Sequence, residues 1–192
     1  MIDAALQLIT SQLDQALRPS AVPRSDAVAV LSSLADPDGT AVTLAADKLV
    51  VFLLNIERES AARRDLGRVE FGAGRIGLVQ PPVHLNLLLM FVANFSGSHY
   101  REGLKCLAST IEFFQSRPVL DHANTPDLHR GIGHLSLEME TLSLSDLGNL
   151  WGVLGGPVRP AVLYRVRMIT IDAAQLHGQV PLVTRPGVAA GG

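Results

Sequence analysis

One glycine-rich stretch has the residue spacing of a nucleotide-binding loop. Gly72, Gly74 and Gly77 fit the pattern GxGxxG, whose glycines let a dinucleotide pyrophosphate approach the N-terminus of a following helix. Here Pro81 and Pro82 follow too soon for a helix to form, and no acidic residue lies about twenty residues further on to bind a ribose. We therefore predict a glycine turn and no cofactor.

A second set of residues has the side chains of a metal site. Carboxylates and imidazoles are common ligands of divalent cations. Five of them lie close together in one polar stretch: Asp121, His122, Asp127, His129 and His134. No pair has the spacing of a known ligand signature. We expect solvent-facing side chains here and no bound metal.

The single cysteine, Cys106, is the one candidate for a nucleophilic thiol. It lies between Leu104 and Leu107 on a predicted helix, where cysteine usually acts as a small buried apolar residue. A catalytic thiol needs an electropositive setting and a histidine partner, and no serine lies in a GxSxG turn. We therefore expect no catalytic residues and no enzymatic activity.

The remaining candidates are charged residues that share strand faces. Glu138 and Glu140 lie on one face of a predicted strand, and Arg165 and Arg167 lie on one face of another. Two neighbouring carboxylates resemble an acid–base pair. The simpler hypothesis is that the four charges form ion pairs, either across the polar face of a sheet or across a subunit boundary.

Charges of both signs also crowd the segment from Glu57 to Arg75. Such a mixture is typical of a solvated loop or strand edge. The alternative is a contact between subunits through Arg58, Arg63 and Arg64. Together with Glu138, Glu140, Arg165 and Arg167, these three arginines make up the predicted interface residues.

Composition and charge exclude several classes of protein. The 192 residues carry a formal net charge of −2 and no basic stripe, so we expect no nucleic-acid partner. The longest apolar runs, Leu49–Leu54 and Leu87–Ala93, are far shorter than the roughly 18 residues that span a bilayer. The N-terminus lacks a basic signal-peptide start. We expect a cytosolic protein that does not insert into membranes.

The elements that position these side chains follow from the spacing of apolar residues. The predicted helices cover residues 2–17 and 98–116, the second capped by Ser98. The predicted strands cover residues 27–34, 48–56, 83–95, 135–140 and 162–170, of which the last is predicted to be the longest. This order predicts an α+β fold, a single domain over residues 1–172 with helices packed on a mixed β-sheet. Residues 173–192 are predicted to form a loosely ordered tail.

A third helix lies between the last two predicted strands and has strong local signals. Ser143 is a good N-cap, with Asp146 placed to complete a capping box. Gly155 and Gly156 supply a stop, since glycine adopts the left-handed conformation that ends many helices. We expect Trp151 to be buried under this helix, with an indole N–H that needs a partner.

Three stretches resemble a known family. They are LNLLLMFVANFSGSHYREGLKCLASTIEFFQSRPVLD (residues 85–121), LSLEMETLSLSDLGNLWGVLGG (135–156) and VLYRVRMITID (162–172). In order and spacing they are similar to the cap, or tail-terminator, proteins of phage-tail-like contractile injection systems. The resemblance implies a fold similar to that of phage tail terminators. It also implies a structural protein without enzymatic activity.

The resemblance further implies partners and a location. Such a protein forms a homohexameric ring at the end of the inner tube and sheath distal to the baseplate, and it stops their polymerisation. It assembles in the bacterial cytoplasm and stays in the mature particle. A strand edge is a template for a strand of another chain, so we expect a sheath subunit to dock on one. The alternatives are a cargo adaptor or chaperone of the same particle, or a small hydrolase that uses Cys106 or the histidine stretch.

Overall fold

The computed structural model describes residues 1–18, 26–36, 38–59, 67–71, 75–79, 82–171 and 176–181. The helices are α1 (Ile2–Leu17), α2 (Tyr100–Ser116) and α3 (Leu144–Leu154). The strands are β1 (Ala29–Leu31), β2 (Lys48–Arg58), β3 (Gly67–Phe71), β4 (Arg75–Val79), β5 (Val83–Asn94), β6 (Val119–Asp121), β7 (His134–Glu140), β8 (Ala161–Ile171) and β9 (Leu176–Pro181). Short 3-10 turns lie at Thr43–Ala45 and Gly97–His99.

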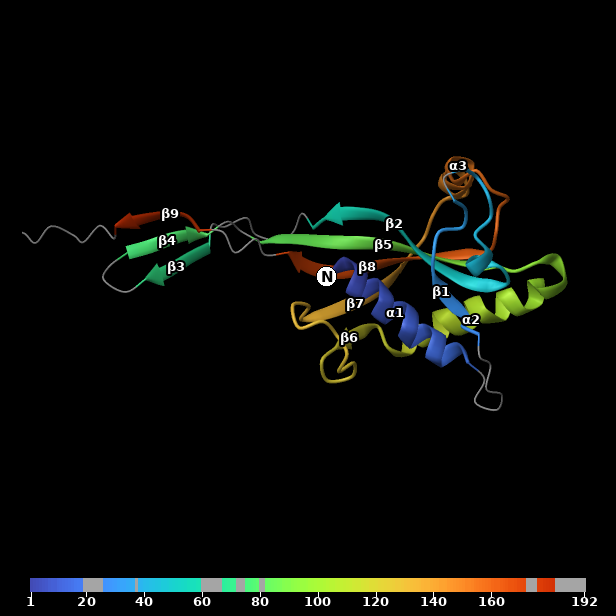
Figure 1. Ribbon diagram of the computed structural model, residues 1–192, viewed down its shortest axis with the longest axis horizontal. Helices are drawn as coiled ribbons and strands as arrows, with labels where there is room; N and C mark the ends of the chain where they lie inside the picture. Colours follow the sequence, from blue (N-terminus) through green and yellow to red (C-terminus); the bar gives the residue numbers. More distant parts are fainter. Residues whose placement is uncertain are drawn as a thin grey trace, which may run out of the picture.

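A six-stranded mixed sheet forms the centre of the fold, in the order β1-β2-β5-β8-β7-β6. Strands β1 and β2 run parallel, and the other neighbouring strands run antiparallel. Helices α1 and α2 lie on one face of this sheet and α3 lies on the other (Figure 1). The fold is therefore the single α+β domain that the sequence predicts.

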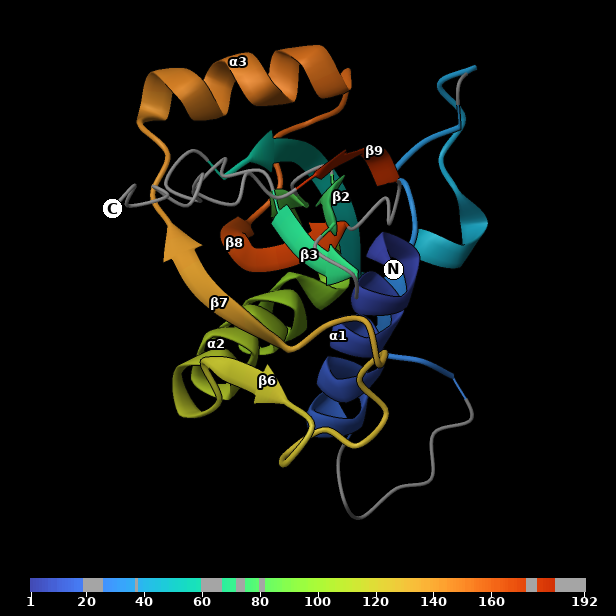
Figure 2. The ribbon, with the colours of Figure 1, turned by 90° about the vertical axis from the view of Figure 1, so that its left-hand side faces the viewer.

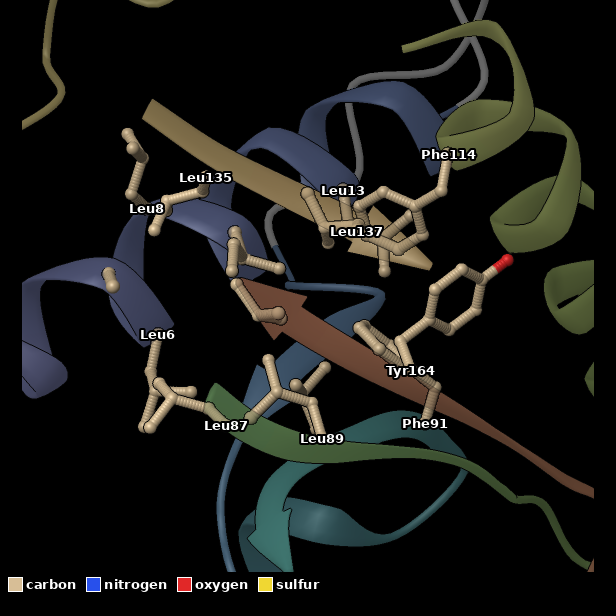
Figure 3. Close-up of a cluster of buried hydrophobic side chains, with 14 of the residues drawn as sticks. Leu6, Leu8, Leu13, Leu87, Leu89, Phe91, Phe114, Leu135, Leu137 and Tyr164 are labelled. Carbon is tan, nitrogen blue, oxygen red and sulfur yellow. The ribbon is translucent and has the colours of Figure 1, made fainter. Parts of the chain in front are cut away.

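Aromatic residues fill the core between the sheet and helices α1 and α2. Phe91 of β5, Phe114 of α2 and Tyr164 of β8 meet with ring centroids 5.1–5.5 Å apart. Leucines of α1, β5 and β7 surround these rings (Figure 3). Each aromatic contact contributes about 0.5–1.5 kcal/mol beyond the burial of apolar area. This cluster therefore fixes both helices on the sheet.

Strand β8 contains a bulge that changes which residues face the core. Between their paired positions, β5 advances two residues, from Leu85 to Leu87, while β8 advances three, from Val166 to Ile169. Both Val166 and Ile169 are fully buried in the same cluster. Strict alternation along the strand would place Ile169 on the face opposite to Val166, but the extra residue reverses the alternation. Strand β8, with 11 residues, is also shorter than β5, with 12.

The sequence patterns did not predict several short elements. Strands β3, β4 and β6 were not predicted, and β1 covers only three residues of the predicted strand 27–34. Strand β9 lies in the segment for which a loosely ordered tail was predicted. Residues 173–175 and 182–192 of that segment lie outside the described ranges. Ser98 lies in a 3-10 turn, and the residue at the N-cap of α2 is His99.

Strands β3, β4 and β9 form a separate three-stranded sheet in the order β3-β4-β9, with both neighbouring pairs antiparallel. It lies at one end of the long axis of the molecule, away from the helices (Figure 1). Figure 2 views the molecule from this end, with the helices behind. The register shift between Leu78 and Val79 marks a bulge in the pairing of β4 with β9.

A buried carboxylate joins α1 to the edge strand β1. Asp14 accepts hydrogen bonds from the backbone N–H of Val28 (2.7 Å) and of Ala29 (3.1 Å), and it pairs with Arg18 on its own helix (2.5 Å). Burial raises the pKa of the Asp14 carboxyl, but these hydrogen bonds outweigh burial and hold the pKa below its ordinary value. The ionised carboxylate is therefore the form that stabilises the fold.

The lowered pKa of Asp14 predicts an acid-dependent loss of stability. Its contribution is fully present above the unfolded-state pKa of about 3.9 and is lost as pH falls through the lower folded-state pKa. Urea denaturation between about pH 5 and pH 2.5 should therefore show a steeper loss of stability for the wild type than for Asp14→Asn. Equal slopes for the two proteins would contradict this assignment.

Helix α2 approaches the sheet closely at a glycine. A Cβ atom on Gly103 would lie 2.9 Å from Cδ2 of Phe95 and 3.2 Å from Cβ of Ala93. Contacts this short force a neighbour to move. On α3, by contrast, a Cβ atom on Gly148 would meet nothing within 4 Å. The two helical glycines therefore form a matched pair for measuring the close approach.

We predict opposite effects for alanine at these two glycines. Alanine is favoured over glycine in a helix by about 1 kcal/mol at either position, so Gly148→Ala should stabilise the protein. Gly103→Ala adds steric cost, which should make it about 2 kcal/mol less stable than Gly148→Ala. Thermal and urea unfolding of both variants would test this difference. Equal stabilities would show that α2 has room for a methyl group.

Candidate assembly surface

One arginine joins three strands on the face of the sheet that α3 only partly covers. Arg165, on β8, donates from Nε to Oε1 of Glu140 on β7 (2.5 Å) and from Nη1 to Oε2 of Glu57 on β2 (2.5 Å). Strand β5 lies between β8 and β2, so the arginine side chain spans β5. The two ion pairs therefore tie β2, β8 and β7 together across the sheet.

The setting of Arg165 keeps it charged. Its hydrogen bond to Glu140 raises the pKa of the guanidinium, burial opposes this effect, and the bond to Glu57 adds to it. The Arg165 side chain is 23% exposed, so solvent screens these ion pairs less than those of a free surface chain. The neighbouring pair, Arg167 with Glu138, is longer (3.5 Å) and more exposed. We expect that pair to contribute little to stability.

Four of these five residues were predicted from the sequence to form ion pairs. In register, Glu138 lies directly opposite Arg165, but the ion pairs run diagonally, so Arg165 binds Glu140 and Arg167 binds Glu138. Pairing across the sheet is thus confirmed for these four charges. Glu57 was missed because its part depends on the strand order, which periodicity does not give.

Of the other three predicted interface residues, the structure describes one. Arg58 is exposed at the end of β2. Arg63 and Arg64 lie outside the described residues. Their role in a contact between subunits stays a prediction, as does that of the four paired charges.

In the described ranges, the residues that were candidates for a metal site or a nucleophile have structural roles. The Asp121 carboxylate accepts from the backbone N–H of Ala123 and of Asn124 in a turn, and Nδ1 of His129 accepts from the N–H of Gly131. Cys106 lies half-buried on α2. Within the described part of the chain, no three His, Cys, Asp or Glu side chains lie close enough to hold a metal ion.

The glycine motif does not lead into a helix. Arg75, Ile76 and Gly77 belong to β4, whereas residues 72–74 lie outside the described ranges. A pyrophosphate site at a helix N-terminus is therefore ruled out where β4 follows. Among the helices that the structure describes, none is long and apolar enough to cross a membrane.

A groove lies beside α3. Its volume is about 630 Å³, and it separates the C-terminal end of α3 from the turn at residues 33–41. Its lining includes Leu34, Phe52, Trp151, Leu154 and Arg159. Trp151 is 2% exposed, as predicted, yet its indole N–H has no hydrogen-bond partner among the described residues. No sequence pattern predicted this groove, which depends on how α3 packs over β2.

Helix α3 has the predicted cap and stop, and two of its large apolar side chains are exposed. The Ser143 hydroxyl accepts from the N–H of Asp146, and Gly155 ends the helix with φ +69°, both as predicted. Leu144 is 88% exposed and Val153 is 86% exposed. The two side chains are nine residues apart, about half a turn from each other around the helix axis, so they are two separate exposed apolar positions.

Comparison with models of known protein families shows which family this chain belongs to. The model of one family, described as the Pvc16 N-terminal domain, matches residues 4–185. The chain belongs to this family. The match runs from α1 through β9, so every strand of both sheets lies within the Pvc16 N-terminal domain. No curated protein matches the chain.

Two solved structures share the fold of this Pvc16 N-terminal domain. One is the PVC sheath/tube terminator of an extracellular contractile injection system in its extended state, with 16% identity and a TM-score of 0.58 over 100% of this chain. The other is the tube-terminating cap of the anti-feeding prophage, with 18% identity and a TM-score of 0.60 over 97% of this chain. The chain spans 64% and 60% of the length of those two chains. The resemblance to cap and tail-terminator proteins, predicted from the sequence, is confirmed.

The ion pairs of Arg165 predict a measurable difference from Arg167. Arg165→Met leaves two partly buried carboxylates without a cation and should cost about 2 kcal/mol of unfolding free energy. Arg167→Met removes only an exposed pair and should cost about 0.5 kcal/mol or less. Urea denaturation at neutral pH would measure both. If the two variants lose equal stability, Arg165 does not hold the three strands together.

Proposed function

We propose that this chain is the subunit of a structural cap that ends the inner tube and sheath of a contractile injection system. The observation that carries the proposal is that both structural relatives, matched over 97–100% of this chain, are terminators of such particles. Membership of the Pvc16 N-terminal domain family supports it independently of the structure comparison. The cap acts by binding at the end distal to the baseplate, where it stops polymerisation. It needs no catalytic group to do so.

The proposed assembly is a homohexameric ring. A cyclic ring joins two different surfaces of the same chain, and for six subunits each contact turns by about 60°. The chain offers unlike surfaces of this kind: helix α3, with Leu144 and Val153 exposed, and the charged face around Glu138 and Arg167. Arg165 and Glu140 bond within the subunit and would hold that charged face in shape.

The proposed contact with the sheath is the free edge of β7. Strand β6 pairs only with His134–Ser136, and Leu137 donates its N–H to the carbonyl of Pro118. Met139, two residues on, directs its backbone groups to the same outer side and is exposed. A strand of a sheath subunit added here would gain main-chain hydrogen bonds. A capped-particle map with side-chain contacts alone at this junction would contradict the proposal.

One observation favours the alternative of a cargo adaptor or chaperone. The groove beside α3 has apolar lining residues, among them Leu34, Phe52 and Leu154, which suits an extended apolar segment of a cargo protein. An adaptor would bind such cargo at low stoichiometry, whereas a cap would form rings or bind tube ends. The particle would assemble in the bacterial cytoplasm under either proposal.

Deletion of the gene followed by electron microscopy of the particles tests the proposed function. Without the cap, tubes should vary in length and sheaths should be short or contracted, because nothing stops polymerisation or holds the extended state. Complementation with the wild type and with Cys106→Ala should restore uniform particles equally. Sheaths and tubes of uniform, stable length in the deletion strain would end the cap proposal. Failure of Cys106→Ala alone would favour the hydrolase.

A further inference from the structure

The three-stranded sheet β3-β4-β9 has two open edges. Strand β4 lies in the middle, and β3 and β9 each pair with it on one side only. Among the described elements, these strands make extended contacts only with one another, and no helix lies over them (Figures 1 and 2). A row of backbone N–H and C=O groups therefore lacks a described partner along β3 and along β9.

A small sheet with two open edges and no covering helix is incomplete by itself. Two or three short strands without a packed layer are marginally stable in water. Soluble proteins usually blunt an open edge or cover it with a helix or loop. Here both edges project at the end of the molecule opposite the helices, where another chain can reach them. The missing component is therefore a strand on each side.

The direction of the strands restricts what the partner is. Strands β3 and β9 both run antiparallel to β4, so they run parallel to each other. A rotation about an axis along the strands preserves direction, so β3 of one copy can meet β9 of the next copy only in a parallel pair. A two-fold dimer would instead pair β3 with β3, or β9 with β9, in antiparallel fashion. The two unlike edges thus suit a cyclic assembly.

We propose that β3 of each subunit pairs in parallel with β9 of the next, so that the small sheets join into one closed β-barrel around the axis of the ring. The inference rests on the proposed hexameric ring. Six copies of three strands supply about eighteen strands, a number that leaves an open aqueous channel in known barrels. With a strand spacing of about 4.8 Å and a tilt of about 40°, the barrel would be on the order of 35 Å across.

Disulfide cross-linking tests the pairing directly. In a Cys106→Ser background, Val69→Cys on β3 is combined in turn with a cysteine at each residue from 176 to 180 on β9. Oxidation of the assembled protein should give a ladder of covalent multimers that ends at six for at least one combination. Val69→Cys paired with Asp38→Cys, an exposed position remote from the small sheet, is the matched control and should give no ladder.

Amide hydrogen exchange of the unmodified protein provides a second measurement that needs no variant. Assembly should slow exchange of amides in both β3 and β9 at least tenfold, because they gain hydrogen bonds in the ring. Dimers from Val69→Cys alone would overturn the parallel pairing. Hexamers by native mass spectrometry without cross-links or slowed exchange would overturn the barrel and leave the proposed cap intact. Absence of any ring with the tube present would overturn both.

Discussion

Burial of β5 on both of its faces is the constraint on which the rest of the fold depends. Leu89 and Phe91 face the cluster under α1 and α2, whereas Met90 and Val92 face the cluster under α3. A strand that is apolar on both sides must be covered on both sides. The two helical layers, the interior position of β5 and the peripheral position of the charged residues all follow from this requirement.

Local signals in the sequence predicted the parts of the fold that residues nearby in the chain determine. The cap at Ser143, the stop at Gly155 and the amphipathic α1 each depend on neighbours within a few residues. The long strand β5 was also predicted, since its apolar run is continuous. The short strands β3, β4 and β6 were not, because three to five residues carry too little apolar alternation to indicate a strand until its partners are known.

The candidate surface was predictable in composition but not in geometry. Alternation placed Glu138, Glu140, Arg165 and Arg167 on shared faces, yet the partners depend on register and on the strand order that brings Glu57 opposite β8. The bulge in β8 was not predictable for the same reason, because pairing with β5 and packing of the core determine where it lies. At 16–18% identity, the two structural relatives retain the arrangement while most residues differ. The apolar pattern and the order of the layers therefore determine this fold more than the identities of particular side chains do.

The two ends of the molecule differ in structure, which gives any ring of this chain a direction. Helices gather at one end of the long axis and the bare three-stranded sheet projects from the other. Cyclic symmetry cannot exchange the top and bottom of a ring, so any ring of this chain would be a polar object with two chemically distinct rims. One rim can then be reactive towards a growing polymer while the other is inert. The proposed cap needs such unlike rims, because a second rim like the first would offer the same binding site to another unit.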